Sequence, residues 1–263
     1  MNILRKSMAP ISEEAWEEID EQARVVLKTA LSGRRFADVV GPKGWVFEAV
    51  SLGRLNIPSG QKGELKYGIN KVLPLVETRV PFELDTWELD NAARGAEDID
   101  LEPMENAAKK IAGFEEDAIY HGFSKADIDG LKKASGNKAV KFPDKIEELP
   151  KTISKLIGSF VKESVDGPYT LVLNAEKWEQ LSSYSNGYPL KDVIKDLIGG
   201  KIILAPSIKE SFLITERGGD FRLTIGQDFS IGYEAHDTKK VRLYFTESFT
   251  FQVLDPMAVV MFE

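Results

Sequence analysis

The chain has 263 residues, of which 43% are hydrophobic and 29% are charged, and its formal net charge is -8. The composition is typical of a folded globular protein and excludes a disordered or collagen-like chain. The negative charge argues against a surface built to neutralise phosphates, so we expect no specific nucleic-acid binding. The sequence contains no cysteine, which excludes disulfides, thiolate metal sites and cysteine nucleophiles.

No apolar stretch approaches the roughly 18 residues that a membrane-spanning helix needs. Arg5 and Lys6 are followed by a helix-start sequence and not by the apolar core of a signal peptide. We therefore expect a cytoplasmic protein with no membrane partner. Of the two histidines, His121 lies at the end of a predicted helix and His236 in a polar turn. Both positions are ordinary for histidine, so we predict no metal site.

Residues 13–31 carry apolar side chains at three- and four-residue steps, with acidic residues between them, which predicts an amphipathic helix. Ser12 is placed to cap this helix, and Gly33 follows its end. From residue 45 to about 84 the helical period disappears, and short runs of β-forming residues alternate with glycine and proline. A two-stranded ribbon has no core of its own, so this arm must lie on the parent domain or on a neighbouring chain.

A second amphipathic helix is predicted from about residue 103 to 120, and the polar connection over 122–145 indicates a domain boundary. Helices and strands alternate beyond it, and strands dominate the C-terminal part. The predicted elements are helices from residue 150, over 175–181 and over 190–198, strands over 169–173 and 201–205, and a hairpin joining 211–215 to 221–225 through the turn 217–220.

Sequence motifs with well-defined catalytic mechanics, such as phosphate-binding glycine loops, HExxH and GxSxG, are absent. Asp85, Glu88 and Asp90 lie around Trp87 and can be interpreted as the paired carboxylates of a hydrolase. A strand-to-helix corner with solvated acids explains them better. We predict no catalytic residues and no enzyme activity.

Several strings, in their order and spacing, resemble those of the encapsulins, the linocin-like shell proteins of bacterial and archaeal nanocompartments. The resemblance covers essentially the whole chain, and no single string is a signature by itself. The strings include Gly33-Arg34-Arg35-Phe36, Gly41-Pro42-Lys43-Gly44-Trp45, Trp87-Glu88-Leu89-Asp90, Gly167-Pro168-Tyr169-Thr170-Leu171, Glu216-Arg217-Gly218-Gly219-Asp220, Gly226-Gln227-Asp228 and Phe249-Thr250-Phe251-Gln252-Val253.

This resemblance implies an α+β chain with the fold of tailed-phage major capsid proteins (Hong Kong 97-like). That fold comprises a peripheral domain, an extended loop that lies over an adjacent subunit, and an axial domain at the symmetry axes. The implied divisions are the peripheral domain with the N-terminal helix over 1–49, the extended loop over 50–79, the peripheral domain with the long helix over 80–135, the axial domain over 136–222 and the C-terminal peripheral strands over 223–263.

The resemblance further implies a homo-oligomeric, icosahedral shell of about 60 copies or a larger multiple. Such a shell encloses a cargo enzyme through the cargo's C-terminal targeting peptide. Ferritin-like iron oxidases and dye-decolourising peroxidases are typical cargoes of the family, which links it to iron storage and oxidative stress. Two alternatives stay open: a phage or prophage capsid protein that packages DNA, which the net charge and short N-terminus disfavour, and a bacteriocin or protease-like activity, which the lack of a nucleophile–base pair disfavours.

Three sets of site residues follow from the resemblance. Arg79 and Trp87 are candidates for binding a flavin (FMN) on the outer surface by stacking and charge, although a structural tryptophan explains Trp87 as well. The loop expected at a five-fold pore comprises Ser183, Tyr184, Ser185, Asn186, Gly187 and Tyr188, and it lacks the histidine that some members carry. The groove expected to bind the cargo peptide comprises Asp20, Ala23, Arg24, Leu27, Arg34, Asp38, Asp228 and Ile231.

Overall fold

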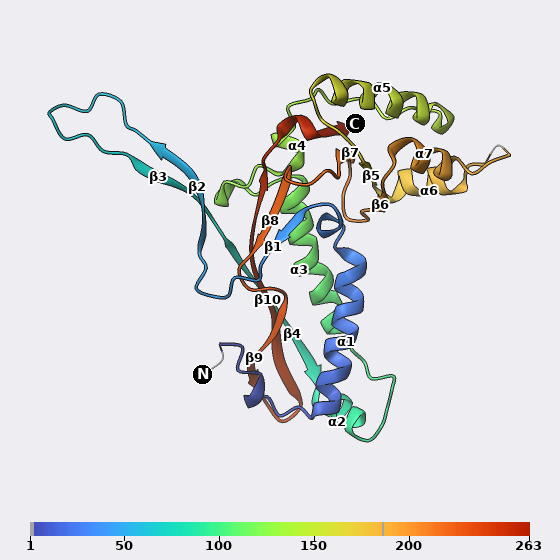
Figure 1. The fold of residues 1–263 in the computed structure, drawn as a ribbon. Helices are drawn as coiled ribbons and strands as arrows, with labels where there is room; N and C mark the ends of the chain where they lie inside the picture. The colour runs from blue at the N-terminus through green and yellow to red at the C-terminus, as the bar shows by residue number, and fades with distance from the viewer. Residues whose placement is uncertain (1–2, 186) are drawn as a thin grey trace.

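The computed structural model describes residues 3–185 and 187–263. The molecule is elongated, with two helices and one long strand running along its length (Figure 1). A two-stranded arm projects from one side, and a compact group of helices covers one end. The two ends are linked by a continuous path of packed strands and by α3.

A five-stranded sheet forms the long half of the molecule. Its order is β1-β8-β10-β4, and β9 pairs with β10 beside this path. The β10 strand is antiparallel to β4, β8 and β9, and β1 is parallel to β8. The strands are β1 (Asp38–Val40), β4 (Val76–Asp85), β8 (Phe221–Ile225), β9 (Ser230–His236) and β10 (Lys240–Val253).

Two long helices cover one face of this sheet. In α1 (Glu13–Ala30), the Ser12 hydroxyl accepts a hydrogen bond from the Ala15 N–H at 3.3 Å, and the glutamates of the first turn complement the helix dipole. Its apolar stripe packs with α3 (Glu102–Tyr120) over Phe82 and Phe245 of the sheet. Both helices confirm the sequence predictions to within a residue at each end.

A second, four-stranded sheet lies at the other end of the molecule, in the order β11-β7-β5-β6. Three helices accompany it (Figure 1). The division of the chain into peripheral and axial domains stays a prediction, but β11 places the last residues in the sheet of the predicted axial part. The elements are α5 (Leu149–Lys162), β5 (Tyr169–Leu173), α6 (Ala175–Ser183), α7 (Leu190–Ile198), β6 (Ile202–Leu204), β7 (Ser211–Thr215) and β11 (Val259–Phe262).

The predicted hairpin between 211–215 and 221–225 is wrong, although both strands have the predicted bounds. The β7 strand pairs with β5 and β11, whereas β8 pairs with β10 and β1 in the other sheet. The connecting turn is held by ion pairs of Arg217 with Asp220 at 2.9 Å and Asp255 at 2.7 Å. The chain therefore crosses between sheets here, and the two strands contribute buried side chains to the same apolar core from different sheets.

The projecting arm consists of β2 (Ala49–Asn56) and β3 (Ile69–Pro74), which pair antiparallel. The structure thus confirms an extended excursion within residues 45–84. Its tip is covered by nothing else in the described chain, and many large apolar side chains are exposed along it. These are Leu52, Leu55, Ile57, Leu65, Tyr67, Ile69 and Val72.

Short elements complete the chain. The α2 helix (Thr86–Ala93) follows β4, and α4 (Gly130–Ala134) lies within the connection that was predicted to be polar loop. Among the helices that the structure describes, none has the length and apolar character required to span a bilayer. Single 3-10 turns occur at Lys6–Met8, Gly33–Arg35, Ser124–Ala126, Ile146–Glu148 and Pro256–Ala258.

Candidate functional site

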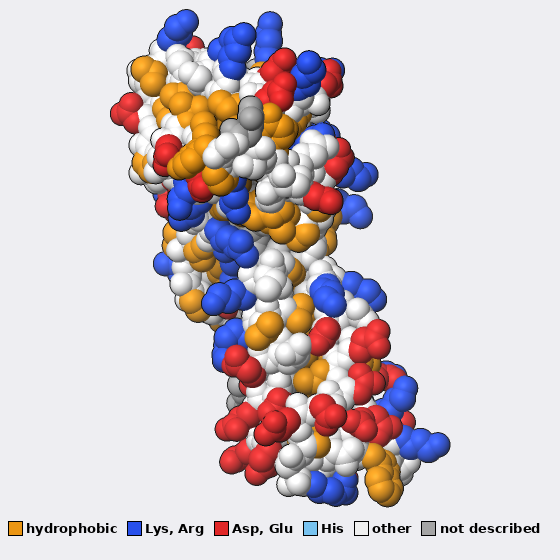
Figure 2. Space-filling view, turned by 90° about the vertical axis from the view of Figure 1, so that its right-hand side faces the viewer, with side chains coloured by type: hydrophobic (Ala, Val, Ile, Leu, Met, Phe, Trp, Pro, Cys, Tyr) orange, Lys and Arg blue, Asp and Glu red, His pale blue; other side chains and the backbone are white. Residues whose placement is uncertain are grey.

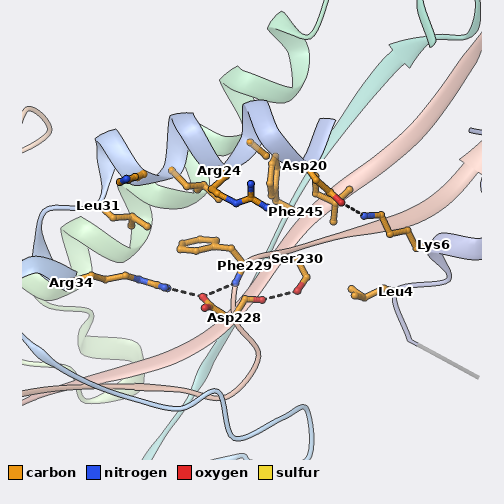
Figure 3. Close-up of a pocket in the computed structure, with 14 residues that line it drawn as sticks. Leu4, Lys6, Asp20, Arg24, Leu31, Arg34, Asp228, Phe229, Ser230 and Phe245 are labelled. Atoms are coloured by element: carbon orange, nitrogen blue, oxygen red, sulfur yellow. Dashed lines mark hydrogen bonds and ion pairs between the residues drawn. The ribbon is translucent and has the colours of Figure 1, made fainter. Parts of the chain in front are cut away.

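A cavity of about 590 Å³ lies between α1 and the segment that enters β9 (Figure 3). Apolar side chains from α1, β9 and β10 form its walls, and charged side chains lie at its ends and rim. The cavity thus has an apolar centre and polar margins. Its lining comprises Leu4, Lys6, Asp20, Ala23, Arg24, Leu27, Lys28, Leu31, Arg34, Asp228, Phe229, Ser230, Ile231 and Phe245. We call it the α1 groove.

The structure brings together all the residues expected in the cargo-peptide groove except Asp38. Asp38 does not line the α1 groove. It begins β1, beside Arg222 of β8, and its Oδ2 accepts a hydrogen bond from the Gly219 N–H at 2.6 Å. Its carboxylate thereby fixes the turn that connects the two sheets, which explains the residue without a ligand.

Sequence reasoning missed half of the lining. Phe229, Ser230 and Phe245 lie far from α1 in the sequence and reach the groove through the pairing of β9 with β10. Leu4 and Lys6 precede the predicted helix, and no sequence signal shows that the N-terminal segment folds back along it. Lys28 and Leu31 continue the stripe of α1, so the helical period alone was sufficient to find them.

Arg34 closes one end of the α1 groove (Figure 3). Its guanidinium donates to Glu115 at 2.7 Å, to Glu247 at 2.5 Å and to Asp228 at 2.8 Å. The ring of Phe229 lies 4.6 Å from the guanidinium carbon, within cation–π distance. Burial opposes the charge of Arg34, but the neighbouring carboxylates outweigh it and raise its pKa further above the ordinary value.

The carboxylates around Arg34 include two that are completely buried, Glu115 and Glu247. Burial, and then the proximity of Glu115, raises the pKa of Glu247 well above its ordinary value. The rise reflects the cost of a second negative charge beside Glu115, because like charges this close cannot both ionise at ordinary cost, and the guanidinium of Arg34 opposes it. The end of the groove is therefore a preformed ionic cluster that fixes Arg34 in place.

The N-terminal segment closes the other end (Figure 3). The Lys6 ammonium lies 2.6 Å from Asp20 and 4.2 Å from the centre of the Trp16 ring, both on α1. The Leu4 carbonyl accepts a hydrogen bond from the Tyr233 N–H of β9 at 2.8 Å. Residues 3–8 therefore bridge α1 and β9 and limit the length of the groove.

The predicted pore loop lies between α6 and α7, and its residue Asn186 is outside the described residues. Tyr184 donates from its hydroxyl to Glu147 at 2.8 Å, and Ser185 pairs with Pro189. Gly187 adopts a positive φ of 77°, and Tyr188 is exposed. The Ser185–Pro189 bridge brings the two ends of the loop together, and the loop's role at a pore stays a prediction.

Arg79 and Trp87 are not brought together within one chain. Arg79 lies opposite Thr246 in the β4–β10 ladder and Asp85 lies opposite Lys240, so Arg79 is six residues, or about 20 Å, from the end of β4 where α2 begins. The Arg79 guanidinium already pairs with Glu77 at 2.9 Å and lies over Tyr244, while the Trp87 side chain is 71% exposed. These residues do not fit a flavin held within one subunit, and the assignment stays a prediction.

The other candidate residues have structural roles. Asp85 caps α2 by accepting from the Trp87 N–H at 2.8 Å, and Glu88 accepts from the Asp100 N–H at 3.2 Å. His121 lies between Asp117 and Glu210, and His236 contacts the Tyr233 hydroxyl at 2.6 Å. Over residues 3–185 and 187–263, no group of three or more side chains is arranged to hold a metal ion.

Solved structures define the class of fold. The chain is similar to the virus-like particle from Pyrococcus furiosus, with a TM-score of 0.69 and 16% identity, over 94% of this chain and 98% of that one. It is also similar to the capsid of the Myoviridae phage XM1, with a TM-score of 0.54 and 12% identity, over 88% and 91%. The fold is therefore that of phage major capsid proteins.

Sequence comparison narrows the class to one family. Residues 1–250 match the family described as "Encapsulating protein for peroxidase". The type 1 encapsulin shell protein of Mycobacterium tuberculosis is 42% identical over 253 residues, which are 95% of each chain. That of Rhodospirillum rubrum is 40% identical over 268 residues, covering 99% of this chain and 96% of the relative. The chain belongs to the encapsulin shell protein family.

Proposed function

We propose that this protein is a structural subunit whose copies close into an icosahedral shell around a cargo enzyme. The β2–β3 arm is the observation that carries the proposal. It projects from the body with apolar side chains exposed, among them Leu65 at 78% and Ile57 at 68% (Figure 1). Exposed apolar patches of this kind mark interaction surfaces. A neighbouring copy supplies the missing cover, and closed symmetry lets every arm be covered.

A second surface supports assembly. Figure 2 shows hydrophobic side chains gathered at the end of the molecule that carries α5 to α7. The exposed apolar residues of these helices and of the loop between α6 and α7 are Val161, Tyr188, Val193 and Leu197. In the proposed shell, this end of each subunit contacts the same end of its neighbours around a symmetry axis. The loop at residues 183–188 borders a pore for small solutes.

The α1 groove is the proposed docking site for the cargo's targeting peptide. Its apolar centre suits aliphatic side chains, and its charged ends orient a chain by its ionic groups. The family description names a peroxidase as the enclosed protein. We propose a peroxidase or a ferritin-like iron oxidase as cargo, in a cytoplasmic shell of about 60 copies or a larger multiple.

A DNA-packaging capsid is the alternative that shares this fold. Acidic side chains gather over the end of the molecule that carries the start of α1 and α2 (Figure 2). The exposed glutamates of α1 include Glu13, Glu14, Glu17 and Glu18. If α1 lines the interior, this surface repels phosphates, which favours a protein cargo over DNA.

Replacing Leu27 by aspartate tests the groove. The change puts a charge into its apolar centre, so shells of normal size should form but lose most of the cargo that copurifies. Val25 lies on the same helix, outside the groove and 48% exposed, so Val25→Asp is the matched control. Cargo per shell is measured by quantitative mass spectrometry of sized particles. Equal loading of both variants would exclude the α1 groove as the docking site.

A further inference from the structure

The wall of the α1 groove opposite the helix is the edge of a strand. The β9 strand pairs with β10 along one side, and in the described chain no strand pairs with its other side. Such an edge presents backbone N–H and C=O groups to any extended chain that lies beside it. The groove therefore contains a backbone-recognition element as well as apolar side chains.

One hydrogen bond shows which residues of β9 present these groups. The Tyr233 N–H donates to Leu4 at 2.8 Å, so the backbone of Tyr233 faces away from β10. Residues of an antiparallel strand alternate between its two edges, so Ile231, two residues earlier and opposite Phe245, faces the same way. Ile231 lines the groove and is 6% exposed, and no bond from its backbone to a partner outside β10 occurs among the described residues.

We propose that the α1 groove binds its peptide by strand addition, with an extended segment of the cargo hydrogen-bonded to the backbone of Ile231 on the free edge of β9. Alternate side chains of the segment then enter the apolar centre beneath Ala23 and Leu27 of α1. This inference rests on the proposed function. It adds that the bound backbone, and not only its side chains, is recognised.

The chain's own N-terminal segment shows that this edge accepts an added chain. Leu4 makes one edge bond at Tyr233, and then Arg5 adopts a positive φ of 50° and a 3-10 turn begins at Lys6. The segment thus turns away from the edge directly after Leu4. The next edge position, at Ile231, lies about 7 Å along the strand and inside the groove. In the proposed complex, a cargo segment bonds to the edge of β9 at Ile231, next to the hydrogen bond that Leu4 makes at Tyr233.

The charges of the groove specify the chemistry of the segment. Four lining residues are cationic, Lys6, Arg24, Lys28 and Arg34, and two are anionic, Asp20 and Asp228. Lys6 and Arg34 are already paired with the two lining carboxylates, so the positive charge that the lining offers to a ligand is that of Arg24 and Lys28 on α1. These cations at the rim favour a segment that carries a carboxylate beside its aliphatic residues. The expected ligand is an extended peptide with alternating aliphatic side chains and an acidic end.

Backbone methylation of a synthetic peptide tests this mode. The probe is fluorescein-labelled Asp-Leu-Ser-Leu-Ser-Leu-Ser-Leu, retained by shells that are disassembled and then reassembled in its presence. One analogue is N-methylated at every Leu and another at every Ser, which blocks opposite edges of the peptide and leaves its side chains unchanged. We expect one analogue to be retained about tenfold less than the probe and the other to be retained normally.

Equal retention of both analogues would overturn strand addition while leaving a side-chain groove, and hence the proposed function, intact. If shells carrying Leu27→Asp retain the unmodified probe as well as the parent shells do, the inference and the groove assignment both fail. As a test from the protein side, Ile231→Pro removes the edge N–H, and Ile231→Val is its control. Only the proline variant should lose the probe, with shell assembly checked by sedimentation.

Discussion

Arg34 places one positive charge among three carboxylates at the end of the α1 groove, two of them buried. The Arg34→Met variant leaves the buried acids without a partner, which costs about 3–5 kcal/mol. We expect its shells to unfold about 10 °C below the parent in a thermal scan. Arg35→Met is the control, because Arg35 is exposed and its guanidinium donates to the Lys28 carbonyl and, among the described residues, to no carboxylate. Equal midpoints for the two variants would contradict the structural role of the cluster.

Glu116 is a second buried acid, on α3, and it holds the turn after α1. It accepts hydrogen bonds from the backbone N–H groups of Ser32 at 2.9 Å and Gly33 at 2.8 Å. Burial raises the pKa of Glu116 to about 7, although these hydrogen bonds oppose the rise. The ordinary value is 4.5, so the folded protein binds this proton more tightly than the unfolded chain does.

The contribution of Glu116 to stability is therefore complete below about pH 4.5 and is lost as the pH rises through about 7. The loss amounts to at most about 3 kcal/mol. We therefore expect the thermal midpoint of the parent protein to decrease between pH 5 and pH 8. The Glu116→Gln variant has no ionisable group at this position, so its midpoint should decrease less. Glu102→Gln, at an exposed position of the same helix, should leave the fall unchanged. A parent midpoint that rises over this range, or an unaltered slope in Glu116→Gln, would refute the assignment.

At the scale of elements, the β2–β3 arm and α1 differ in how they are stabilised. The α1 helix buries Ala15, Ile19, Ala23 and Val26 within its own chain, so its formation needs no partner. The outer part of the arm exposes residues of both strands. Its apolar surface gains burial only when another copy covers it, at about 25 cal/mol per Å².

A charge on the arm should therefore block assembly without unfolding the subunit. The double variant Ile57→Asp and Ile69→Asp changes two exposed apolar residues of the arm. We expect light scattering to show single subunits or small oligomers, with a circular dichroism spectrum like that of the parent. Glu64→Gln, an exposed polar position of the same arm, should assemble normally. Intact particles from the double variant would mean that the arm is not an assembly surface.

The elements also show how far sequence reasoning reaches. The bounds of β5, β7, β8 and α7 agree with their predicted ranges, because each is set by local periodicity and by flanking glycine or proline. The partners of β7 and β8 were predicted incorrectly, because the same turn residues suit a hairpin and a crossover. Whether a hairpin or a crossover forms depends on which distant strands pair with β7 and β8, here β5 and β10.

At the scale of the whole molecule, two observations point to different contents of the shell. The fold is shared with phage capsids, which enclose DNA, whereas the net charge of -8 disfavours DNA and favours a protein cargo. A protein shell with an acidic interior should purify without nucleic acid. We expect closed particles in electron micrographs and an ultraviolet spectrum of protein alone, unchanged by nuclease. Nuclease-resistant DNA inside the particles would instead favour the capsid function. Empty particles with no DNA and no copurifying protein would leave the shell proposal standing but contradict cargo capture by the parent protein.

The α1 groove shows the limit of prediction for a site. Its helical wall follows from a period of three and four residues within α1, and the family resemblance located part of the opposite wall. Arg34 joins Glu115, Asp228 and Glu247 across 81, 194 and 213 residues of sequence, respectively. Contacts at such separations leave no local pattern, and the fold-back of the N-terminal segment onto β9 leaves none either.

The sequence by itself determined α1, α3, α5, α6 and α7, most strands, the unsupported arm and the family, because these depend on side-chain periods and on turn residues close together in the chain. Only the tertiary structure decided which strands pair, why Asp38 lies outside the groove and how Leu4 reaches the edge of β9. Strand pairing and burial depend on which surfaces, distant in the sequence, pack together most favourably. Local propensity does not determine that choice.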